Sequence, residues 1–410
     1  MYLASVDRPA GTTRTRATKV TANVLALGTV SLVTDVSSEM VTAVLPLYLV
    51  AGLGLGPAVY GLVDGLYTGA TALLRLVGGY VADRVRRRKL VAGLGYAISA
   101  VAKAGLLVAG GSPAGIGTAI VADRAGKGLR TAPRDALITL ATPPEALGRA
   151  FGVHRAMDSA GAFAGPVVAL AVLAASGQAF DAVFVVSGCV AAVGVLVLVL
   201  FVRDHRETGT PSKTVSLRQA AALLEHRPVR LLLGGAALLG LSTIGDGFVY
   251  LLLQRRGNLA TGWFPLLAVG TSLAYLLLAV PLGAVADRLG RTGVFLGGYA
   301  ALLVVYLLLT ASWGGPAALV TVLVLYGLFY AATDGVLIAV AGPVLPAALR
   351  TTGIALIQTG QSLAYLVSSV LFGIAWQWWG AAGAVRAAAI TAALTLGGSA
   401  VLLLRGGRAA

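Results

Sequence analysis

Two six-residue segments of nearly identical sequence lie half a chain length apart in this protein. Gly-Tyr-Val-Ala-Asp-Arg covers residues 79–84, and Gly-Ala-Val-Ala-Asp-Arg covers residues 283–288. Each copy ends a long apolar run and begins a basic loop. Two later runs also begin alike, with Arg-Ala-Phe-Gly at 149–152 and Arg-Thr-Thr-Gly at 350–353. The chain therefore reads as two homologous halves, an arrangement typical of alternating-access membrane carriers.

Composition places both halves in a membrane. Of the 410 residues, 58% are hydrophobic and only 11% are charged, whereas soluble domains carry about 25% charged residues. Because a bilayer core requires roughly 20 apolar residues per helix, we predict an all-α integral membrane fold with twelve transmembrane helices in two pseudo-symmetric six-helix bundles. The predicted spans are 20–51, 57–82, 89–110, 113–140, 147–175, 179–203, 229–254, 261–286, 292–312, 315–341, 348–377 and 381–404.

The polar segment at the middle of the chain divides it into domains. We predict an N-terminal tail (1–19), an N-terminal bundle (20–203), a linker (204–228), a C-terminal bundle (229–405) and a C-terminal tail (406–410). The apolar run that follows the tail is too long for a signal peptide and has no small-residue cleavage site, so the first span should be retained.

The net charge is +15, and most of the basic residues lie in loops that alternating spans place on one side of the membrane. Basic residues crowd the tails, the linker and the loops after the second and eighth spans, and Arg255, Arg256 and Arg386 are exceptions. The positive-inside rule places these basic segments and both termini in the cytoplasm. We read the charge as a topology signal in a cell membrane and a contact with lipid head groups, not as a nucleic-acid site. Five tryptophans near predicted helix ends are expected at the membrane interfaces: Trp263, Trp313, Trp376, Trp378 and Trp379.

The duplicated loops carry a family resemblance. The segment Gly-Tyr-Val-Ala-Asp-Arg-Val-Arg-Arg-Arg-Lys at 79–89 resembles the loop between helices two and three of the major facilitator superfamily, and 283–291 resembles its second-half copy. Arg86 stands where that family usually has a glycine. The resemblance implies a conformational gate formed by Gly79, Asp83, Arg84, Arg87, Gly283, Asp287, Arg288 and Arg291. The alternative interpretation is that the two loops are only basic segments that anchor the chain at the membrane surface.

The fifth span contains Gly161-Ala-Phe-Ala-Gly165-Pro166. This segment resembles the Gly-x-x-x-Gly-Pro core that proton antiporters of the superfamily carry in helix five. Glycines four residues apart share one helix face and permit close approach, and proline adds a bend. We therefore assign Gly161, Gly165 and Pro166 to gating and favour export over import.

The fourth span holds the densest charge, from Asp123 to Asp135. Arg124, Lys127 and Gly128 resemble the helix-four Arg-x-x-Gln-Gly motif of proton-coupled superfamily members, with Lys127 in place of glutamine. The resemblance implies a role for Arg124 in proton transfer, and we assign its neighbour Asp123 to proton coupling as well. The departures at Lys127 and Arg130 leave a proton relay open and add anion binding as a second interpretation, and a purely structural ion-pair network is the third.

Acids in other first-half spans complete the candidate coupling site. Asp35 and Glu39 lie four residues apart on one helix face, and two carboxylates so close disfavour joint ionisation, which suits a proton carrier. His154 and Asp158 are the candidates in the fifth span, where His154 could relay protons or only contact lipid head groups or the linker. We assign Asp64, Arg75 and Arg155, with Lys127 and Arg130, to substrate binding.

The second half has fewer charges. Asp246 and Asp334 each lie beside glycines, which should loosen the seventh and tenth spans as in discontinuous transporter helices. We predict that the second half forms the substrate wall through Asp246, Tyr250, Asp334, Gln358 and Gln361.

Enzyme motifs are missing from the sequence, including phosphate loops, nucleophile turns and metal-binding helices. We predict no enzyme activity, no cofactor and no metal. The favoured function is proton-coupled export of a small organic or drug-like molecule by a functional monomer. Import or exchange of an anionic metabolite is the alternative, and a non-transporting scaffold or receptor is the alternative of a different class.

Overall fold

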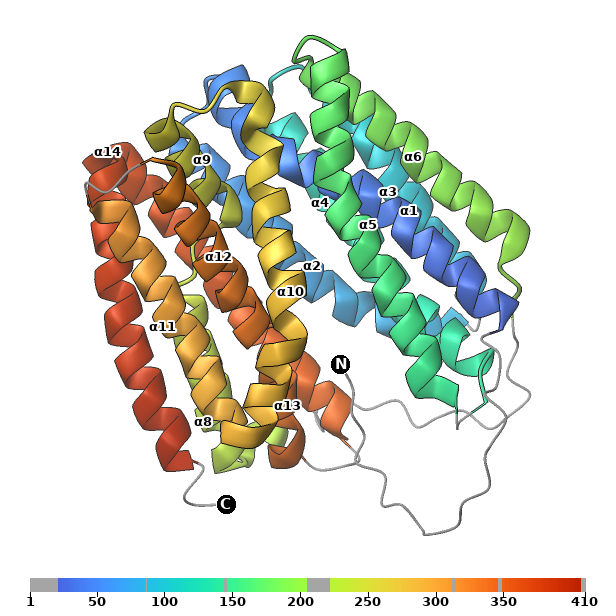
Figure 1. Cartoon of the computed structure of the whole chain (residues 1–410). Helices are drawn as coiled ribbons and strands as arrows, with labels where there is room; N and C mark the ends of the chain where they lie inside the picture. Colours follow the sequence, from blue (N-terminus) through green and yellow to red (C-terminus); the bar gives the residue numbers. More distant parts are fainter. Residues whose placement is uncertain are drawn as a thin grey trace.

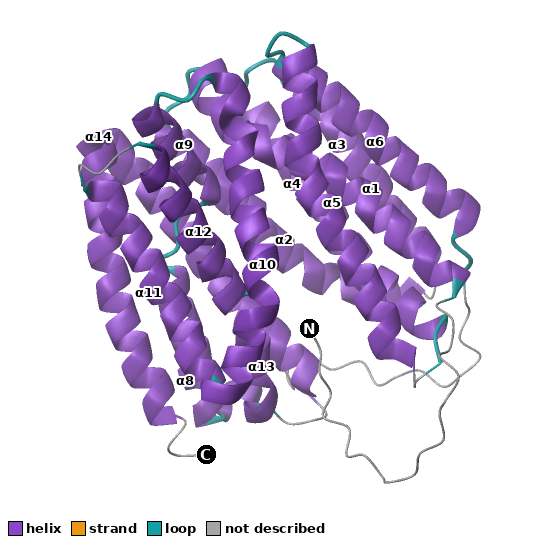
Figure 2. Ribbon diagram, viewed as in Figure 1, coloured by secondary structure: helices purple, strands orange, loops and turns teal. Residues whose placement is uncertain are grey.

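The computed structural model describes residues 21–85, 87–143, 146–204, 222–311, 315–345 and 349–406, with side chains omitted at 75–85, 342–343, 350–351 and 404–406. Within these ranges the secondary structure is helical, and no strand occurs (Figure 2). The first half comprises α1 (Ala22–Leu47), a π-helical turn η1 (Tyr48–Gly52), α2 (Pro57–Val85), α3 (Arg88–Val108), α4 (Pro113–Leu140), α5 (Leu147–Ala175) and α6 (Phe180–Phe201). The second half comprises η3 (Leu223–Glu225), α8 (Arg227–Gly240), α9 (Asp246–Gly257), η4 (Thr261–Trp263), α10 (Phe264–Leu289), α11 (Arg291–Thr310), α12 (Pro316–Thr333), α13 (Val336–Val344) and α14 (Arg350–Gly406).

These helices form the twelve predicted spans. Eight helical segments within the described ranges are long and apolar enough to cross a membrane. One of them, α14, contains two spans because Gly380 breaks it with a φ of 74°. Three further spans complete the twelve. They are the long helices α2 and α4, which carry four and six charged residues, and the interrupted span made of α8 and α9. The predicted fold class is therefore confirmed.

The predicted weak points in the seventh and tenth spans are real breaks. α8 ends at Gly240 and α9 begins at Asp246, and the Tyr306 hydroxyl bridges the gap by donating to the Ser242 carbonyl (2.9 Å) and accepting from the Ile244 amide (3.0 Å). α12 ends at Thr333, and α13 follows Gly335, whose φ is +78°. Broken helices persist in a membrane only where side chains or water replace the lost backbone bonds, and Tyr306 does so for the first break.

The helices form two bundles that contact each other through two pairs of helices. In the first half α1 packs on α5 and α6, and α3 and α2 pack on α4; in the second half α14 packs on α8 and α11, and α12 packs on α10 and α11. The contacts between halves are mainly α2 with α14 and α5 with α10. The beginning of α1 and the end of α14 lie on the same side of the molecule, which we call the terminal side (Figure 1).

The halves are in close contact on the opposite side. A Cβ at Gly373 of α14 would approach the Ala58 Cα of α2 to 3.1 Å, and one at Gly247 of α9 would lie 2.8 Å from the Pro46 Cβ of α1. On the terminal side the ends of α5 and α10 diverge (Figure 1). The halves are therefore sealed together at one side and spread at the other.

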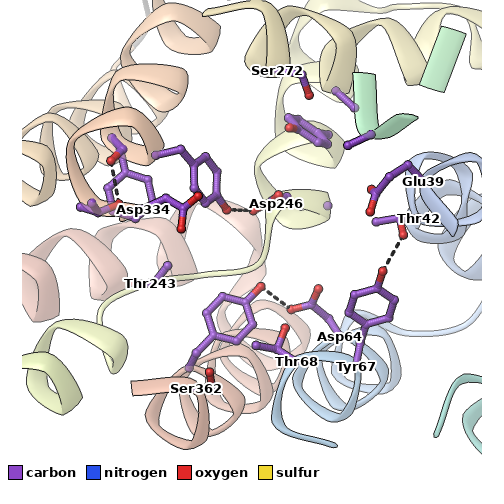
Figure 3. A pocket seen from close by; sticks show the side chains of 18 of the residues that line it. Glu39, Thr42, Asp64, Tyr67, Thr68, Thr243, Asp246, Ser272, Asp334 and Ser362 are labelled. Atoms are coloured by element: carbon purple, nitrogen blue, oxygen red, sulfur yellow. Dashed lines mark hydrogen bonds between the residues drawn. The ribbon is translucent and has the colours of Figure 1, made fainter. Parts of the chain in front are cut away.

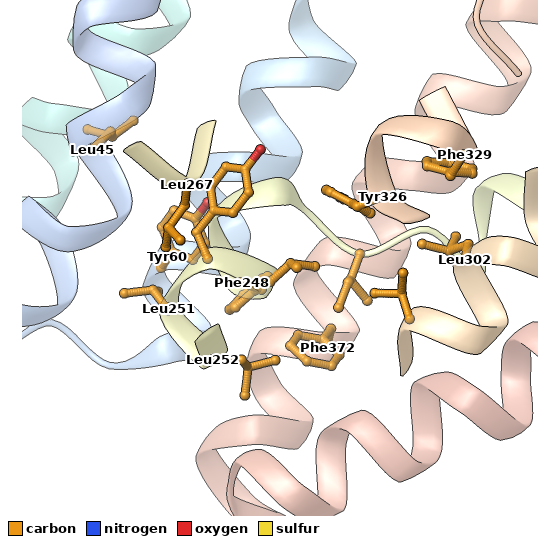
Figure 4. Close-up of a cluster of buried hydrophobic side chains, with 14 of the residues drawn as sticks. Leu45, Tyr60, Phe248, Leu251, Leu252, Leu267, Leu302, Tyr326, Phe329 and Phe372 are labelled. Carbon is orange, nitrogen blue, oxygen red and sulfur yellow. The ribbon is translucent and has the colours of Figure 1, made fainter. Parts of the chain in front are cut away.

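An aromatic cluster lies behind this seal. The Phe248 ring contacts Tyr60 (4.7 Å between centroids), Phe372 (4.8 Å) and Trp376 (5.6 Å), so α2, α9 and α14 share one core (Figure 4). The prediction that Trp376 lies at a membrane interface is thus wrong, because its ring is buried. Trp263, Trp378 and Trp379 are exposed as expected, and Trp313 lies outside the described residues.

Candidate functional site

A central cavity of about 580 Å³ lies between the two halves. Its walls come from α1, α2 and α5 on one side and from α8 to α14 on the other. The volume falls in the range of small-molecule binding sites. Four acids line it, Glu39 and Asp64 from the first half and Asp246 and Asp334 from the second (Figure 3).

Asp64 connects the two halves. Its carboxylate accepts hydrogen bonds from Ser369 (2.6 Å) and Tyr365 (3.0 Å) of α14, and from Tyr60 (3.4 Å) one turn earlier in α2. A Cβ at Gly245 would collide with the Asp64 carboxylate, so the loop before α9 also lies against it. Charge-assisted hydrogen bonds are stronger than neutral ones, and here they cross the interface between halves.

The second-half acids lie at the two helix breaks. Asp246 is in the first turn of α9, where the helix dipole favours a negative charge, and it accepts hydrogen bonds from Tyr326 (2.8 Å) and Tyr330. Asp334 caps the end of α12 and accepts a hydrogen bond from Tyr275 (3.1 Å). The breaks thus bring two carboxylates into the cavity wall.

Glu39 differs from the other cavity acids. No described side chain donates a hydrogen bond to it or forms an ion pair with it within 4 Å, although the charges of Lys127 and Arg124 act on it. Its neighbour Thr42 shares a hydrogen bond of 2.8 Å with Tyr67, and the Arg124 guanidinium stacks 3.7 Å above the Tyr67 ring. Glu39 is therefore the cavity acid that is free to pair with an incoming proton or ligand.

A second charged cluster lies beside Glu39, toward the terminal side. The carboxyl groups of Asp35 of α1 and Asp158 of α5 lie within hydrogen-bonding reach of each other. Arg130 approaches Asp35 to 3.8 Å, and Asp158 lies 3.9 Å from Arg134 and 3.7 Å from Arg155. The i, i+4 spacing suggested Glu39 as the partner of Asp35, whereas the direct partner of Asp35 comes from another helix.

Asp123 belongs to a separate network between α3 and α4. It accepts hydrogen bonds from Lys103 (2.9 Å), Arg124 and Ser99. All three donors are buried, and none of these four residues lines the cavity. This arrangement favours the structural reading of the predicted charge cluster over a proton-relay role for Asp123 and Arg124.

His154 is buried, with 1% of its surface exposed, and neither ring nitrogen has a hydrogen-bond partner among the described residues. Contact with lipid head groups is therefore wrong for this residue, whereas contact with the linker concerns a segment that lies mostly outside the described residues. Its role in proton transfer stays a prediction.

The predicted substrate residues divide between the halves. All five from the second half line the cavity, namely Asp246, Tyr250, Asp334, Gln358 and Gln361, as does Asp64. Lys127, Arg130 and Arg155 do not line it, because Arg130 faces Tyr96 of α3 (4.4 Å to the ring centroid) and Arg155 is 68% exposed. The Arg75 side chain lies outside the described residues.

Sequence reasoning missed most of the tyrosines of the cavity. Tyr60, Tyr67, Tyr299, Tyr330 and Tyr365 line it together with Tyr250. A usable signal was present, since Tyr60 lies four residues before Asp64 and therefore on the same helix face.

The glycine motif of α5 lies directly against α1. A Cβ at Gly161 would collide with the Leu32 carbonyl, and one at Gly165 would lie 2.6 Å from the Glu39 Cβ. Pro166 lines the cavity. The motif thus sets the distance between the helix that carries Asp158 and the helix that carries Asp35 and Glu39.

The second copy of the duplicated loop is visible in full. Asp287 pairs with Arg291 at 3.1 Å, and Arg291 also donates to the Ala339 carbonyl of α13 (3.1 Å). Gly290 has a φ of +101°, a conformation that favours glycine. A Cβ at Gly283 would meet no atom within 4 Å, and Arg288 is exposed. In the first copy, Arg87 is exposed, while the side chains of residues 79–85 and all of Arg86 lie outside the described residues.

No group of three or more potential metal ligands occurs in the described part of the chain.

Comparison with known proteins agrees with this architecture. The sequence model of the Major Facilitator Superfamily matches residues 27–267, more than half of the chain. A protein of Methanocaldococcus jannaschii, named "Uncharacterized MFS-type transporter MJ1317", is 29% identical over 365 residues, 87% of this chain and 88% of the relative. The Mycobacterium bovis protein Mb2288 is 35% identical over 157 residues, 38% of each chain.

Solved structures share the fold. A variant of the nucleoside transporter NupG has a TM-score of 0.79 at 15% identity and covers 92% of this chain and 99% of its own. A bacterial homologue of the human lysosomal transporter Spinster, inward-facing and occupied, has a TM-score of 0.73 at 16% identity, with 94% and 96% covered. An auto-inhibited peptide transporter of the POT family has a TM-score of 0.77 at 14% identity, with 95% and 97% covered. The chain belongs to the major facilitator superfamily, and it is a multi-pass membrane transporter and not an enzyme.

Proposed function

We propose that this transporter exports a small organic molecule in exchange for protons. The observation that carries the proposal is the Asp35 and Asp158 carboxyl pair beside the cavity acid Glu39. Two carboxyl groups hydrogen-bond to each other only when one of them carries a proton. The pair therefore supports a proton-binding site next to the substrate cavity.

The three carboxyls form a path from the cavity toward the terminal side. Glu39 lies one helical turn from Asp35, and Asp35 contacts Asp158, whose side chain is 24% exposed. The charge of Lys127 acts on all three acids. A change in protonation at one of them thus alters the electrostatic environment of the others.

Two features support export by alternating access. The α5 glycine motif resembles that of superfamily antiporters, and it packs α5 against Glu39. The opposite side is sealed while the terminal side is spread (Figure 1). We propose that the terminal side faces the cytoplasm of a cell membrane, as the basic loops indicate, so this conformation would accept substrate from inside.

The duplicated loops would then lie at the cytoplasmic gate. We propose that Asp83 and Asp287 hold their loops in the state that closes this side, with Asp287 exchanging partners around Arg291. Because one chain encloses the complete cavity, we also propose a functional monomer. The anionic alternative gains no support, since no described basic side chain lines the cavity.

Uptake into inverted membrane vesicles tests the proposal. An acidic lumen should drive accumulation of solutes from a chemically diverse library in vesicles with the wild-type chain, and Glu39→Gln and Asp35→Asn should abolish the dependence on the gradient. Transport that is indifferent to the pH gradient and to both substitutions would refute proton coupling. If the chain moves no solute under any gradient, a scaffold or receptor is the better description.

A further inference from the structure

We infer that the substrate is an organic cation with an aromatic or apolar body. This inference rests on the proposed transport function and adds the chemical class of its substrate. It is carried by the charge and the aromatic lining of the central cavity (Figure 3).

The sign of the cavity charge opposes that of the whole chain. Lys and Arg number 31 and Asp and Glu only 16, yet the described cavity lining contains four acids and no Lys, Arg or His. Burying an ionised carboxylate without a counter-charge is unfavourable. A positively charged ligand would supply the missing counter-charge.

The buried cations of the first half are engaged elsewhere. Lys103 and Arg124 pair with Asp123, Arg130 with Asp35, and Arg134 with Asp135. Lys127 forms no ion pair within 4 Å with a described residue, and its charge acts on Asp35, Glu39 and Asp158. None of these cations lines the cavity, so the cavity acids have no cation of the chain in the described wall.

Asp64 and Asp246 belong to different halves and lie close together in the cavity wall. The charge of Asp246 acts on Asp64, and the described cavity lining around both carboxylates contains no Lys, Arg or His. Gly245, which directly precedes Asp246, would collide with the Asp64 carboxylate if it carried a Cβ. Two neighbouring carboxylates without a cation favour a positively charged group between them.

Tyrosines complete the recognition surface. Tyr60 and Tyr365 donate to Asp64, and Tyr330 donates to Asp246, so these phenol hydroxyls are occupied by the acids. The electron-rich faces of tyrosine rings attract ammonium and similar cations. Six tyrosines around four acids therefore suit a bulky quaternary ammonium or phosphonium compound better than a neutral or acidic solute.

The test uses two probes of the same shape and opposite charge. Tetraphenylphosphonium and tetraphenylborate are titrated into the full chain in lipid nanodiscs without a pH gradient, with empty nanodiscs as the blank. Saturable binding of the phosphonium alone is expected. Asp64→Asn and Asp246→Asn should each weaken it about tenfold or more, because each removes a charge-assisted contact, whereas Asp181→Asn on the exposed start of α6 should bind as the wild type does.

Equal binding of both probes, or phosphonium binding unchanged in Asp64→Asn and Asp246→Asn, would overturn the inference. Glu39→Gln serves as the third variant if either asparagine variant does not fold. Since binding is measured without a gradient, failure of proton coupling leaves this result unaffected. Gradient-driven transport of neutral or acidic solutes without phosphonium binding would instead refute the cation class and leave the proposed function standing.

Discussion

Gly165 of α5 lies directly against Glu39 of α1, so that a Cβ at Gly165 would lie 2.6 Å from the Glu39 Cβ. The same contact surface includes Gly161 and the Leu32 carbonyl one turn away. α5 also carries Asp158, the partner of Asp35. The glycine motif and the candidate proton path are therefore two parts of one helix interface.

Gly165→Ala should reduce transport because the added methyl group forces α5 away from Glu39. Overpacking of this kind costs about 1–3 kcal/mol, so the melting temperature of the purified protein should fall as well. Gly188→Ala in α6 is the matched control, since its Cβ would meet no atom within 4 Å. Full transport by Gly165→Ala would show that the close approach is unnecessary.

Tyr306→Phe should destabilise the protein by about 1–3 kcal/mol, because it leaves two buried backbone groups unsatisfied at the break between α8 and α9. The Tyr306 hydroxyl is hydrogen-bonded to Ser242 and Ile244. Thermal unfolding in detergent, followed by circular dichroism, measures the effect.

Tyr96→Phe is the control for that experiment, because the Tyr96 hydroxyl is buried and has no hydrogen-bond partner in the part of the chain that the structure describes. Its removal should be neutral or stabilising. Equal melting temperatures for Tyr306→Phe and Tyr96→Phe would contradict the bridging role.

Asp123→Asn should destabilise the chain by about 3–5 kcal/mol, since it leaves the buried Lys103 and Arg124 without their carboxylate. Adding Lys103→Met should restore part of the loss, because it removes one of the two uncompensated charges. Folded yield and melting temperature are the readouts. If Asp123→Asn is stable but has lost gradient dependence, Asp123 takes part in proton coupling instead.

The sequence predicted the scaffold well for physical reasons. Span length follows from bilayer thickness, and glycines beside Asp246 and Asp334 correctly marked both helix breaks. Contacts between helices were harder to predict, because the spacing of residues along one helix identifies only neighbours within that helix. The i, i+4 pattern therefore suggested Asp35 with Glu39, whereas the carboxyl that contacts Asp35 is Asp158.

The cavity composition was the least predictable part. Tyrosines in apolar helices resemble ordinary core residues until the fold places their hydroxyls on Asp64 and Asp246. Position near a helix end likewise suggested an interfacial Trp376, although its ring packs on Phe248. Conversely, the charges of α4 looked like a binding site but are largely engaged with one another and with α3.

Proton movement driven by substrate tests the central claim most directly. In proteoliposomes with a pH-sensitive dye in the lumen, substrate added outside without a pH gradient should enter and drive protons out, so that the lumen becomes alkaline. Glu39→Gln should abolish the dye response. Substrate entry with no change in luminal pH, or an equal pH change in Glu39→Gln, would contradict proton exchange through the acids beside the cavity.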